Sequence, residues 1–187
     1  ALFREILLES ILYKKKNTNQ FDINSLIVKP ILDRKNDLDL SVIMPLEEKK
    51  RFAENKAIKS IVARIVQARK KDASVIMMLG GHVVRAGVQR YIIDLMERGF
   101  ISCLAMNGSV MIHDFEFALI GATTESVARY IREGQFGLWK ETGRINDIIN
   151  QGYKDGLGMG EAVGEAILKG DFPYKNISLL AAGYRLK

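Results

Sequence analysis

A chain of 187 residues, 48% of them hydrophobic, is long enough to fold as one domain with an added arm around a packed core. Its three prolines and mixed composition exclude wholesale disorder, its single cysteine excludes an internal disulfide, and its apolar runs are far shorter than the ~20 residues that cross a bilayer. The net charge of +6 is uneven, because residues 1–71 carry 16 basic against 9 acidic side chains, whereas residues 72–187 carry 12 against 13.

The first third of the chain contains a helical pattern at each end. Residues 1–13 have apolar side chains near helical spacing, which predicts a short helix. Residues 23–44 mix apolar and polar clusters, so we expect irregular structure with a short strand at Ile23–Val28. A second helix is expected over residues 45–71, because a proline followed by glutamates suits a helix start and three cations suit the last turn.

The middle of the chain alternates strand and helix patterns. Ser74–Leu79 is a mostly apolar run ended by two glycines, which is typical of a strand buried on both faces of a parallel sheet. A helix is expected at Gly87–Arg98, a second strand at Ile101–Met106, and another helix at about Val110–Ile120, with a glycine after each helix as its stop.

The last third of the chain reads as mainly helical. Thr123 or Thr124 is expected to cap a helix. Further helices are expected at about Lys140–Tyr153, Gly160–Leu168 and Asn176–Lys187. Strands that alternate with helices indicate right-handed crossovers, and therefore an α/β fold.

The predicted strands also predict buried side chains. We expect the Met77–Met78 pair to lie in the core, and we expect Cys103 to be a small buried residue rather than a reactive thiol. The pattern of helices and strands becomes clear only from Pro45 onward. We therefore divide the chain into an N-terminal arm, residues 1–44, and a domain, residues 45–187.

Ligands in an open α/β sheet gather at the carboxyl ends of the strands, and a glycine-containing loop follows each predicted strand. In the first loop, Gly80, Gly81 and Gly87 allow a close approach of the backbone, and Arg85 adds a fork-shaped donor. The helix start after this loop offers free N–H groups that suit a phosphate. The spacing differs from the Gly-x-Gly-x-x-Gly dinucleotide pattern, so a plain tight turn stays open as the alternative.

The second loop, Asn107–Gly108–Ser109, offers an amide, an open backbone and a hydroxyl. His113 and Asp114 lie one turn into the next helix, near enough to reach the same crevice. Asp114 is a candidate for a hydrogen bond to a ribose hydroxyl, and the alternative is a favourable charge near a helix start. For this loop the ligand-binding and structural interpretations are equally open.

His82 and His113 are the two histidines of the chain. Each is a candidate ligand contact, because both lie at the loop mouths. As catalytic bases they compete with structural roles, a loop histidine bonded to backbone and a half-buried helix histidine. No third ligand is spaced to join them, so we expect no metal site.

The segment Gly80–Leu119 resembles deoxyhypusine synthases, which carry Thr-Ser-Asn-x-Ile-Ser-Ser-Gly, a helix, a strand and Thr-Ala-Gly-Gly-x-Glu-Glu-Asp-Leu. A bacterial group of synthase-like proteins, with Gly-Gly-His-Val-Ile-Lys and Ala-Met-Asn-Gly-x-x-x-Ile-His-Asp-Phe-Glu, is more similar still at Gly80–Arg85 and Ala105–Glu116. The phrases at Ile131–Gly143 and Ser178–Ala182 are similar to the same group.

The resemblance implies a Rossmann-like NAD-binding domain, a parallel sheet flanked by helices with a helical N-terminal arm, that assembles as a homo-oligomer. Because the synthases use NAD to move an aminobutyl group from spermidine to a protein lysine, it also implies a transferase that acts on an amine or polyamine. Carried over by position, the family's cofactor contacts fall on Gly81, His82, Arg85, Asn107, Gly108, Ser109 and His113.

The chain also departs from the synthase pattern. Arg85 replaces a serine and His113 replaces a glutamate, so a hydroxyl or carboxylate contact to a ribose is not preserved. Arg85 suggests a more anionic ligand than NAD, with an additional phosphate. The imine-forming lysine motif of the family has no counterpart, so we expect a domain that is incomplete at its C-terminus, and no catalytic residue is named.

Two other functions stay open. A non-catalytic nucleotide-sensing module would explain the altered contacts. A nucleic-acid-binding arm would use the basic run Lys14–Lys16, but no aromatic residues interleave with it, so a solvated surface is favoured. We expect a cytoplasmic protein without a membrane segment.

Overall fold

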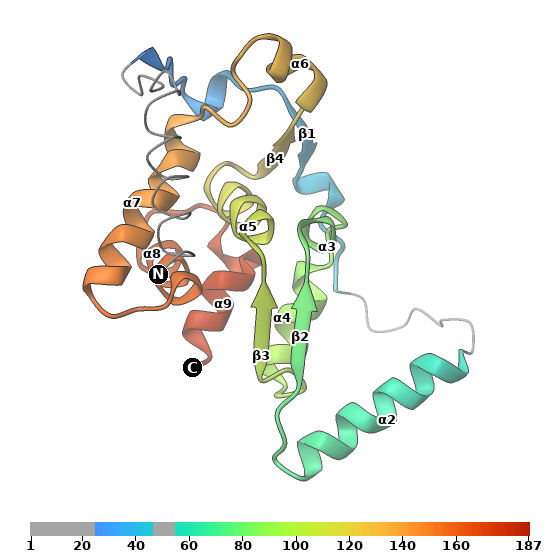
Figure 1. The fold of residues 1–187 in the computed structure, drawn as a ribbon. Coiled ribbons are helices and arrows are strands. Elements are labelled where there is room, and N and C mark those ends of the chain that lie inside the picture. The colour runs from blue at the N-terminus through green and yellow to red at the C-terminus, as the bar shows by residue number, and fades with distance from the viewer. Residues whose placement is uncertain (1–24, 47–54) are drawn as a thin grey trace, which may run out of the picture.

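The protein is described by a computed structural model that covers residues 25–46 and 55–187 (Figure 1). The helix expected at residues 1–13 lies outside the described residues. The described part of the strand expected at Ile23–Val28 is not a strand, and the next residue, Lys29, forms a single parallel bridge.

Helix α2 spans Lys56–Lys70, so it begins later than the start that we expected near Pro45. Asn55 caps it, because the Asn55 Oδ1 accepts hydrogen bonds from the N–H groups of Ala57 and Ile58. The expected acidic first turn lies partly outside the described residues.

Two parallel strands form the centre of the strand–helix unit in the middle of the chain. Strand β2, Ile76–Leu79, pairs in parallel with β3, Cys103–Met106, from the first residue to the last. The connection between them contains α3, Gly81–Arg85, and α4, Gln89–Glu97, and α5, Gly108–Ile120, follows β3. This strand–helix–strand–helix order confirms the α/β prediction in the middle of the chain.

The helix expected at Gly87–Arg98 is two helices, with a break at Gly87. Gly87 has a φ of +77°, and a Cβ there would collide with the Val42 carbonyl group. The carbonyl oxygen of Gly87 also accepts a 2.8 Å hydrogen bond from Met44 N. The break between the two helices therefore lets the segment around Val42 and Met44 pack against Gly87.

A second, smaller sheet joins the N-terminal segment to the domain. Strand β1, Asn36–Asp39, pairs antiparallel with β4, Ala122–Glu125. Short 3-10 turns, η2 at Ile31–Asp33 and η3 at Leu40–Val42, flank β1. The prediction of a helix cap at Thr123 or Thr124 was therefore wrong, and the following helix α6, Val127–Arg132, begins after Ser126.

The C-terminal third consists of helices. They are α7 (Lys140–Lys154), α8 (Met159–Lys169), the short η4 (Lys175–Ile177) and α9 (Leu179–Arg185). The first two agree with the predicted helices, and the third predicted helix is divided by Ser178, whose side chain accepts from Ala181 N and caps α9.

Helix α5 lies at the centre of the molecule, between the parallel strands and the C-terminal helices (Figure 1). Phe115 and Phe117 are buried on different sides of this helix, in separate apolar clusters. Phe115 packs edge-on against Phe172, with ring centroids 5.1 Å apart. A helix that is buried on most of its surface is apolar nearly all round, which is why α5 is mostly apolar although it contains His113, Asp114 and Glu116.

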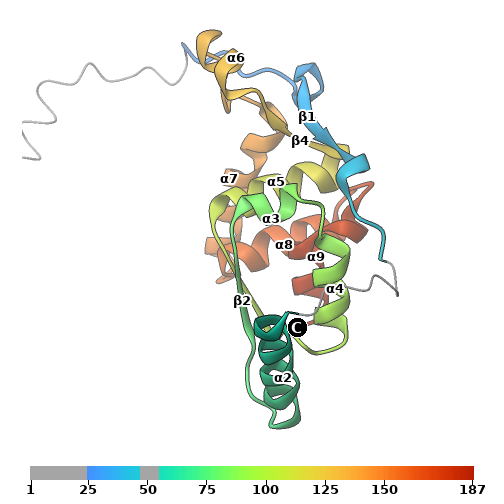
Figure 2. The same cartoon turned by 90° about the vertical axis from the view of Figure 1, so that its right-hand side faces the viewer.

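The prediction that both faces of the parallel strands are buried was wrong. Ile76 is 61% exposed and Met78 is 82% exposed, whereas Leu79 is buried. Figure 2 shows the cause, because α4 and α9 lie on one side of the β2–β3 pair and the other side is open. Cys103, which we expected in the core, is also exposed, because it is the register partner of Ile76 and lies with it on the uncovered face.

Helix α2 projects away from the rest of the domain (Figure 1), and its apolar stripe is uncovered. This stripe consists of Ile58, Ile61, Val62 and Val66, which are between 36% and 56% exposed. Within residues 25–46 and 55–187, no helix is both long enough and apolar enough to cross a membrane.

Candidate functional site

The two predicted loops meet at the same edge of the parallel strands. Leu79 and Met106, the last residues of β2 and β3, are register partners. A Cβ on Gly80 would lie 3.9 Å from the side-chain amide of Asn107. A Cβ on Gly81 would lie 3.0 Å from His113 Cδ2 and would overlap the Ser109 hydroxyl, so glycine is what lets α3 close onto α5 at this position.

The first loop is shorter than we expected. Helix α3 starts directly after Gly80, which caps it without a side chain, and five residues later the chain turns again. The open glycine loop predicted up to Gly87 is therefore mostly helix. The space over Gly81 is filled by Ser109 and His113, whereas no atom lies within 4 Å of a Cβ built on Gly108.

Two of the predicted site residues have structural roles elsewhere. Gly87 packs against the backbone at Val42, as described above. Asp114 is only 1% exposed, and its carboxylate accepts from the Ser178 hydroxyl at 2.6 Å and from the N–H groups of Leu179 and Leu180 at 2.8 and 3.1 Å. Asp114 thus holds the first turn of α9 and does not face the loop edge.

Burial dominates the electrostatics of this carboxyl group. Loss of hydration raises the pKa of Asp114 to about 6, although its three hydrogen bonds oppose the rise.

A cavity of about 350 Å³ opens beside the loop edge. Three predicted site residues, Arg85, Ser109 and His113, contribute to its wall. The rest of the wall comes from the segment before β1, the small sheet, α5, the segment before α7 and the first turn of α7, and it includes Arg34, Glu116, Thr124, Glu125, Phe136, Trp139 and Thr142. The cavity therefore joins the strand edge to the N-terminal segment.

A buried ion pair forms the floor of this cavity. Arg34 donates from Nη1 and Nη2 to the two carboxylate oxygens of Glu116, both at 2.8 Å, and each side chain is only 2% exposed. Glu116 also accepts from the hydroxyls of Thr123 at 2.6 Å and Thr142 at 2.9 Å. Four donors thus saturate this carboxylate, which suits its burial.

His113 is tied to the same network. Its Nδ1 lies 2.8 Å from Thr123 Oγ1, and burial lowers the pKa of the ring, while the charge of Glu116 acts in the opposite direction. Burial therefore favours the neutral imidazole over the charged form.

Polar atoms on the other wall of the cavity have no partner. Arg85 Nε and Thr124 Oγ1 are both buried without a hydrogen bond in the described part of the protein. Arg85 makes one long polar contact, 3.4 Å from Nη1 to His82 Nε2. Thr124 also has a φ of +67°, a strained value for a β-branched residue. A buried donor without a partner needs an acceptor, which an ordered water or a polar ligand in the adjoining cavity can supply.

The second carboxylate of the cavity is held by neutral donors. Glu125 accepts from Gly137 N at 3.0 Å and from Trp139 Nε1 at 2.7 Å. Trp139 and Phe136 complete an apolar wall.

The sequence analysis missed several wall residues. Glu116 had a visible signal, since it is a charge inside the apolar run of α5, and such a charge must be paired. Arg34 and Thr124 had none, because their places depend on the long-range pairing of β1 with β4.

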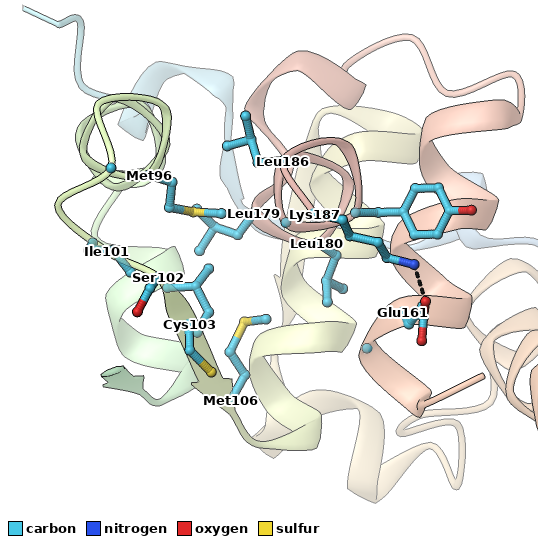
Figure 3. Close-up of a pocket in the computed structure, with 15 residues that line it drawn as sticks. Met96, Ile101, Ser102, Cys103, Met106, Glu161, Leu179, Leu180, Leu186 and Lys187 are labelled. Atoms are coloured by element: carbon cyan, nitrogen blue, oxygen red, sulfur yellow. Dashed lines mark hydrogen bonds and ion pairs between the residues drawn. The ribbon is translucent and has the colours of Figure 1, made fainter. Parts of the chain in front are cut away.

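A larger cavity of about 650 Å³ lies elsewhere, along β3 and α9 (Figure 3). Its wall includes Cys103, Met106 and Leu180, and at its mouth Lys187 pairs with Glu161. It shares no residue with the 350 Å³ cavity and contains none of the predicted site residues. Within the described residues, no group of three His, Cys, Asp or Glu side chains is arranged to hold a metal ion.

Comparison with known families adds an independent finding. A family model described as "Arginine dihydrolase ArgZ-like, C-terminal, Rossmann fold" matches residues 59–179, more than half of the chain. No curated protein and no solved structure matches significantly. The match supports a Rossmann-like α/β domain, here with helices around a small sheet.

The same match shows that the resemblance to deoxyhypusine synthases was misleading. The phrases that carried it, Gly80–Arg85 and Ala105–Glu116, lie inside the matched segment. Glycines after apolar strands recur in unrelated Rossmann-like domains, so they did not identify the family. The predicted aminobutyl transfer from a polyamine, which depended on that resemblance, was therefore also wrong. The non-catalytic nucleotide-sensing module that we kept as an alternative gains no support from the match.

Proposed function

The chain belongs to the family of ArgZ-like arginine dihydrolase C-terminal Rossmann-fold domains, and from this premise we propose that it is the dinucleotide-binding domain of an arginine dihydrolase-like protein. The proposed ligand is NAD, bound at the carboxyl edge of β2 and β3 and in the adjoining 350 Å³ cavity. A Rossmann-like domain uses this edge for nucleotides because the following helix starts and loops converge there.

One observation carries the proposal, namely the unpaired Arg85 Nε. A guanidinium group that lines a cavity and leaves a buried N–H without an acceptor costs free energy, unless a ligand supplies the acceptor. Both carboxylates of the cavity, Glu116 and Glu125, already accept hydrogen bonds from other groups. Arg85 is therefore available to a phosphate oxygen of the ligand.

The other groups suit the remaining parts of a dinucleotide. The cavity volume is at the lower end of the range for ligand pockets, so it would hold one half of the molecule. The open side of Gly108, where the 13-residue helix α5 begins, would take the pyrophosphate beside Arg85. The Thr124 hydroxyl would gain a partner in a ribose hydroxyl, and Trp139 would offer an apolar surface to a base.

Titration calorimetry of the full chain with NAD, with NADP and with L-arginine tests the proposal. We expect saturable heat from a dinucleotide and none from arginine. Arg85→Met should weaken binding by about tenfold or more, because a charge-assisted hydrogen bond is worth ~1.5–3 kcal/mol. Arg90→Ala is the matched control, since Arg90 is an exposed arginine on α4 away from the cavity.

The outcome also decides between ligand classes. Heat from NADP but not from NAD would support the phosphate-rich ligand suggested by Arg85. Heat from arginine alone, or identical binding by Arg85→Met and the wild type, would refute the proposal. The Arg85→Met variant should fold normally, because it removes an unpaired buried donor rather than a paired one.

We also keep the homo-oligomer and the cytoplasmic location as proposals. The uncovered stripe of α2, Ile58 to Val66, supports an oligomer because isolated apolar stripes of this kind usually pack against another surface. Sedimentation analysis of Ile61→Lys against the wild type tests it, and a monomeric wild type would refute it.

A further inference from the structure

We propose that His113 is a hydrogen-bond acceptor for the ligand, with its Nε2 lone pair fixed on the cavity side by a relay through Thr123 and Glu116. The inference rests on the proposed function and deepens it, because it states what the ligand must present at this point. It must present an O–H or N–H donor, such as a ribose hydroxyl or a carboxamide, rather than a phosphate oxygen.

The direction of each hydrogen bond between His113, Thr123 and Glu116 follows from the number of protons that these groups carry. Glu116, held by both Nη atoms of Arg34, acts as an acceptor. The single hydroxyl proton of Thr123 is donated to Glu116 Oε2 at 2.6 Å. Thr123 Oγ1 is then left with lone pairs towards His113, 2.8 Å from Nδ1, so Nδ1 must carry a proton and donate it.

The direction of these hydrogen bonds also determines the protonation state of the second ring nitrogen, Nε2. A neutral imidazole carries one proton, so a protonated Nδ1 leaves a bare Nε2. Burial favours the neutral ring, and the hydrogen bond of His113 in the described part of the chain is made by Nδ1 rather than Nε2. His113 lines the cavity, so its free acceptor is exposed to a ligand there.

The neighbouring charges are consistent with a neutral ring. Glu116 favours the charged form of His113, but Arg34 is paired with that carboxylate, and Arg85 and His82 both disfavour a further positive charge. The result is a cavity with two complementary points, the donors of Arg85 and the acceptor of His113. A dinucleotide offers acceptors on its phosphates and donors on its riboses and carboxamide, so it can satisfy both.

Magnetic resonance of the histidine nitrogens tests the relay before any ligand is added. The chain has two histidines, so a His82→Gln variant assigns both rings. In the ¹⁵N-labelled full chain near pH 7.5, long-range ¹H–¹⁵N correlations should show His113 protonated at Nδ1 and bare at Nε2. A ring protonated at Nε2, or at both nitrogens, would overturn the inference.

Variants of Thr123 identify the cause of the tautomer. Thr123→Val keeps the shape of the side chain but removes the acceptor, so the proton of His113 should redistribute towards Nε2. Thr123→Ser keeps the hydroxyl and should preserve the wild-type spectrum. If Thr123→Val leaves the spectrum unchanged, the relay does not set the tautomer and the inference fails.

Addition of NAD separates this inference from the proposed function. We expect the Nε2 resonance of His113 to shift while Nδ1 stays protonated, and Thr123→Val to bind NAD about fivefold more weakly. Calorimetric heat without a shift at Nε2 would refute the inference alone. If neither NAD nor NADP gives heat, the proposed function fails, and the tautomer of the ligand-free protein still decides whether the relay exists.

Discussion

The buried Arg34–Glu116 pair links the segment before β1 to α5. A substitution that breaks this pair is predicted to lower the free energy of unfolding strongly. We consider the substitution Arg34→Met, which keeps an unbranched chain beside the Trp139 ring, 5.6 Å from the guanidinium carbon, but removes the charge. It leaves Glu116 buried, 2% exposed, with only two hydroxyl donors for an uncompensated carboxylate.

The expected cost follows from that burial. Removing one partner of a buried, bidentate pair costs about 3–5 kcal/mol, because the remaining charge loses its counter-ion without gaining water. A domain of this size has a free energy of unfolding of roughly 5–15 kcal/mol, so the loss is a large fraction of the total. Urea unfolding followed by circular dichroism measures it.

The double variant Arg34→Met with Glu116→Gln provides the internal test. Glutamine carries no charge, and its carbonyl oxygen can accept from one of the two threonine hydroxyls while its NH2 group donates to the other, so the double variant should be more stable than the sum of the two single costs predicts. Arg129→Met is the matched control, since Arg129 and Glu133 form an exposed pair, with side chains 52% and 41% exposed. That control should cost far less, because an exposed ion pair is solvated and contributes little to stability. An Arg34→Met cost as small as that of the control would refute the reasoning.

Two further predictions concern Asp114 and Gly87. Because the folded-state pKa of Asp114 is raised from 3.8 to about 6, the folded protein binds a proton more readily than the unfolded chain, so its stability relative to Asp114→Asn should rise as pH falls from 7 to 4, by roughly 2 kcal/mol. Urea unfolding at several pH values checks this, and a difference that is constant with pH would contradict it. Gly87→Ala should lower the free energy of unfolding by more than Gly134→Ala, since both positions have a positive φ but only the first lacks room for a Cβ, and equal losses would show that the contact with Val42 is unimportant.

The parts of the fold that could be predicted are those with strong local signals. Strands β2 and β3 and helix α5 are apolar runs that end at glycines, so chain order alone placed their ends together. Strands β1 and β4, with the sequences NDLD and ATTE, are four residues long and mostly polar. They exist because they pair with each other across the chain, and no local pattern encodes such a pairing.

The site was predictable to the same extent. Arg85, Ser109 and His113 were found because they follow the parallel strands directly. Arg34 reaches the site from 82 residues away along the chain, as the partner of Glu116, so sequence spacing gave no indication of it. Asp114 looked like a ligand contact because it neighbours His113, but adjacent helix residues point about 100° apart, and its carboxylate faces α9.

The family assignment failed for a related physical reason. A strand, a glycine turn and an amphipathic helix are what any Rossmann-like unit requires. Matching glycines and apolar positions are therefore evidence for the fold but not for a particular reaction. The exposure of Met78 and Cys103 was missed because a continuous apolar run predicts burial on two faces, whereas only one face of β2–β3 is covered in the described structure.

The central claim is that a dinucleotide satisfies the unpaired guanidinium N–H of Arg85. The most direct measurement follows the Nε–H resonance of Arg85 while NAD is titrated into the labelled full chain, with Arg85→Met to assign the signal. A saturable shift that arginine does not reproduce is the predicted result. A resonance that stays in place while NAD reaches millimolar concentration would contradict the account.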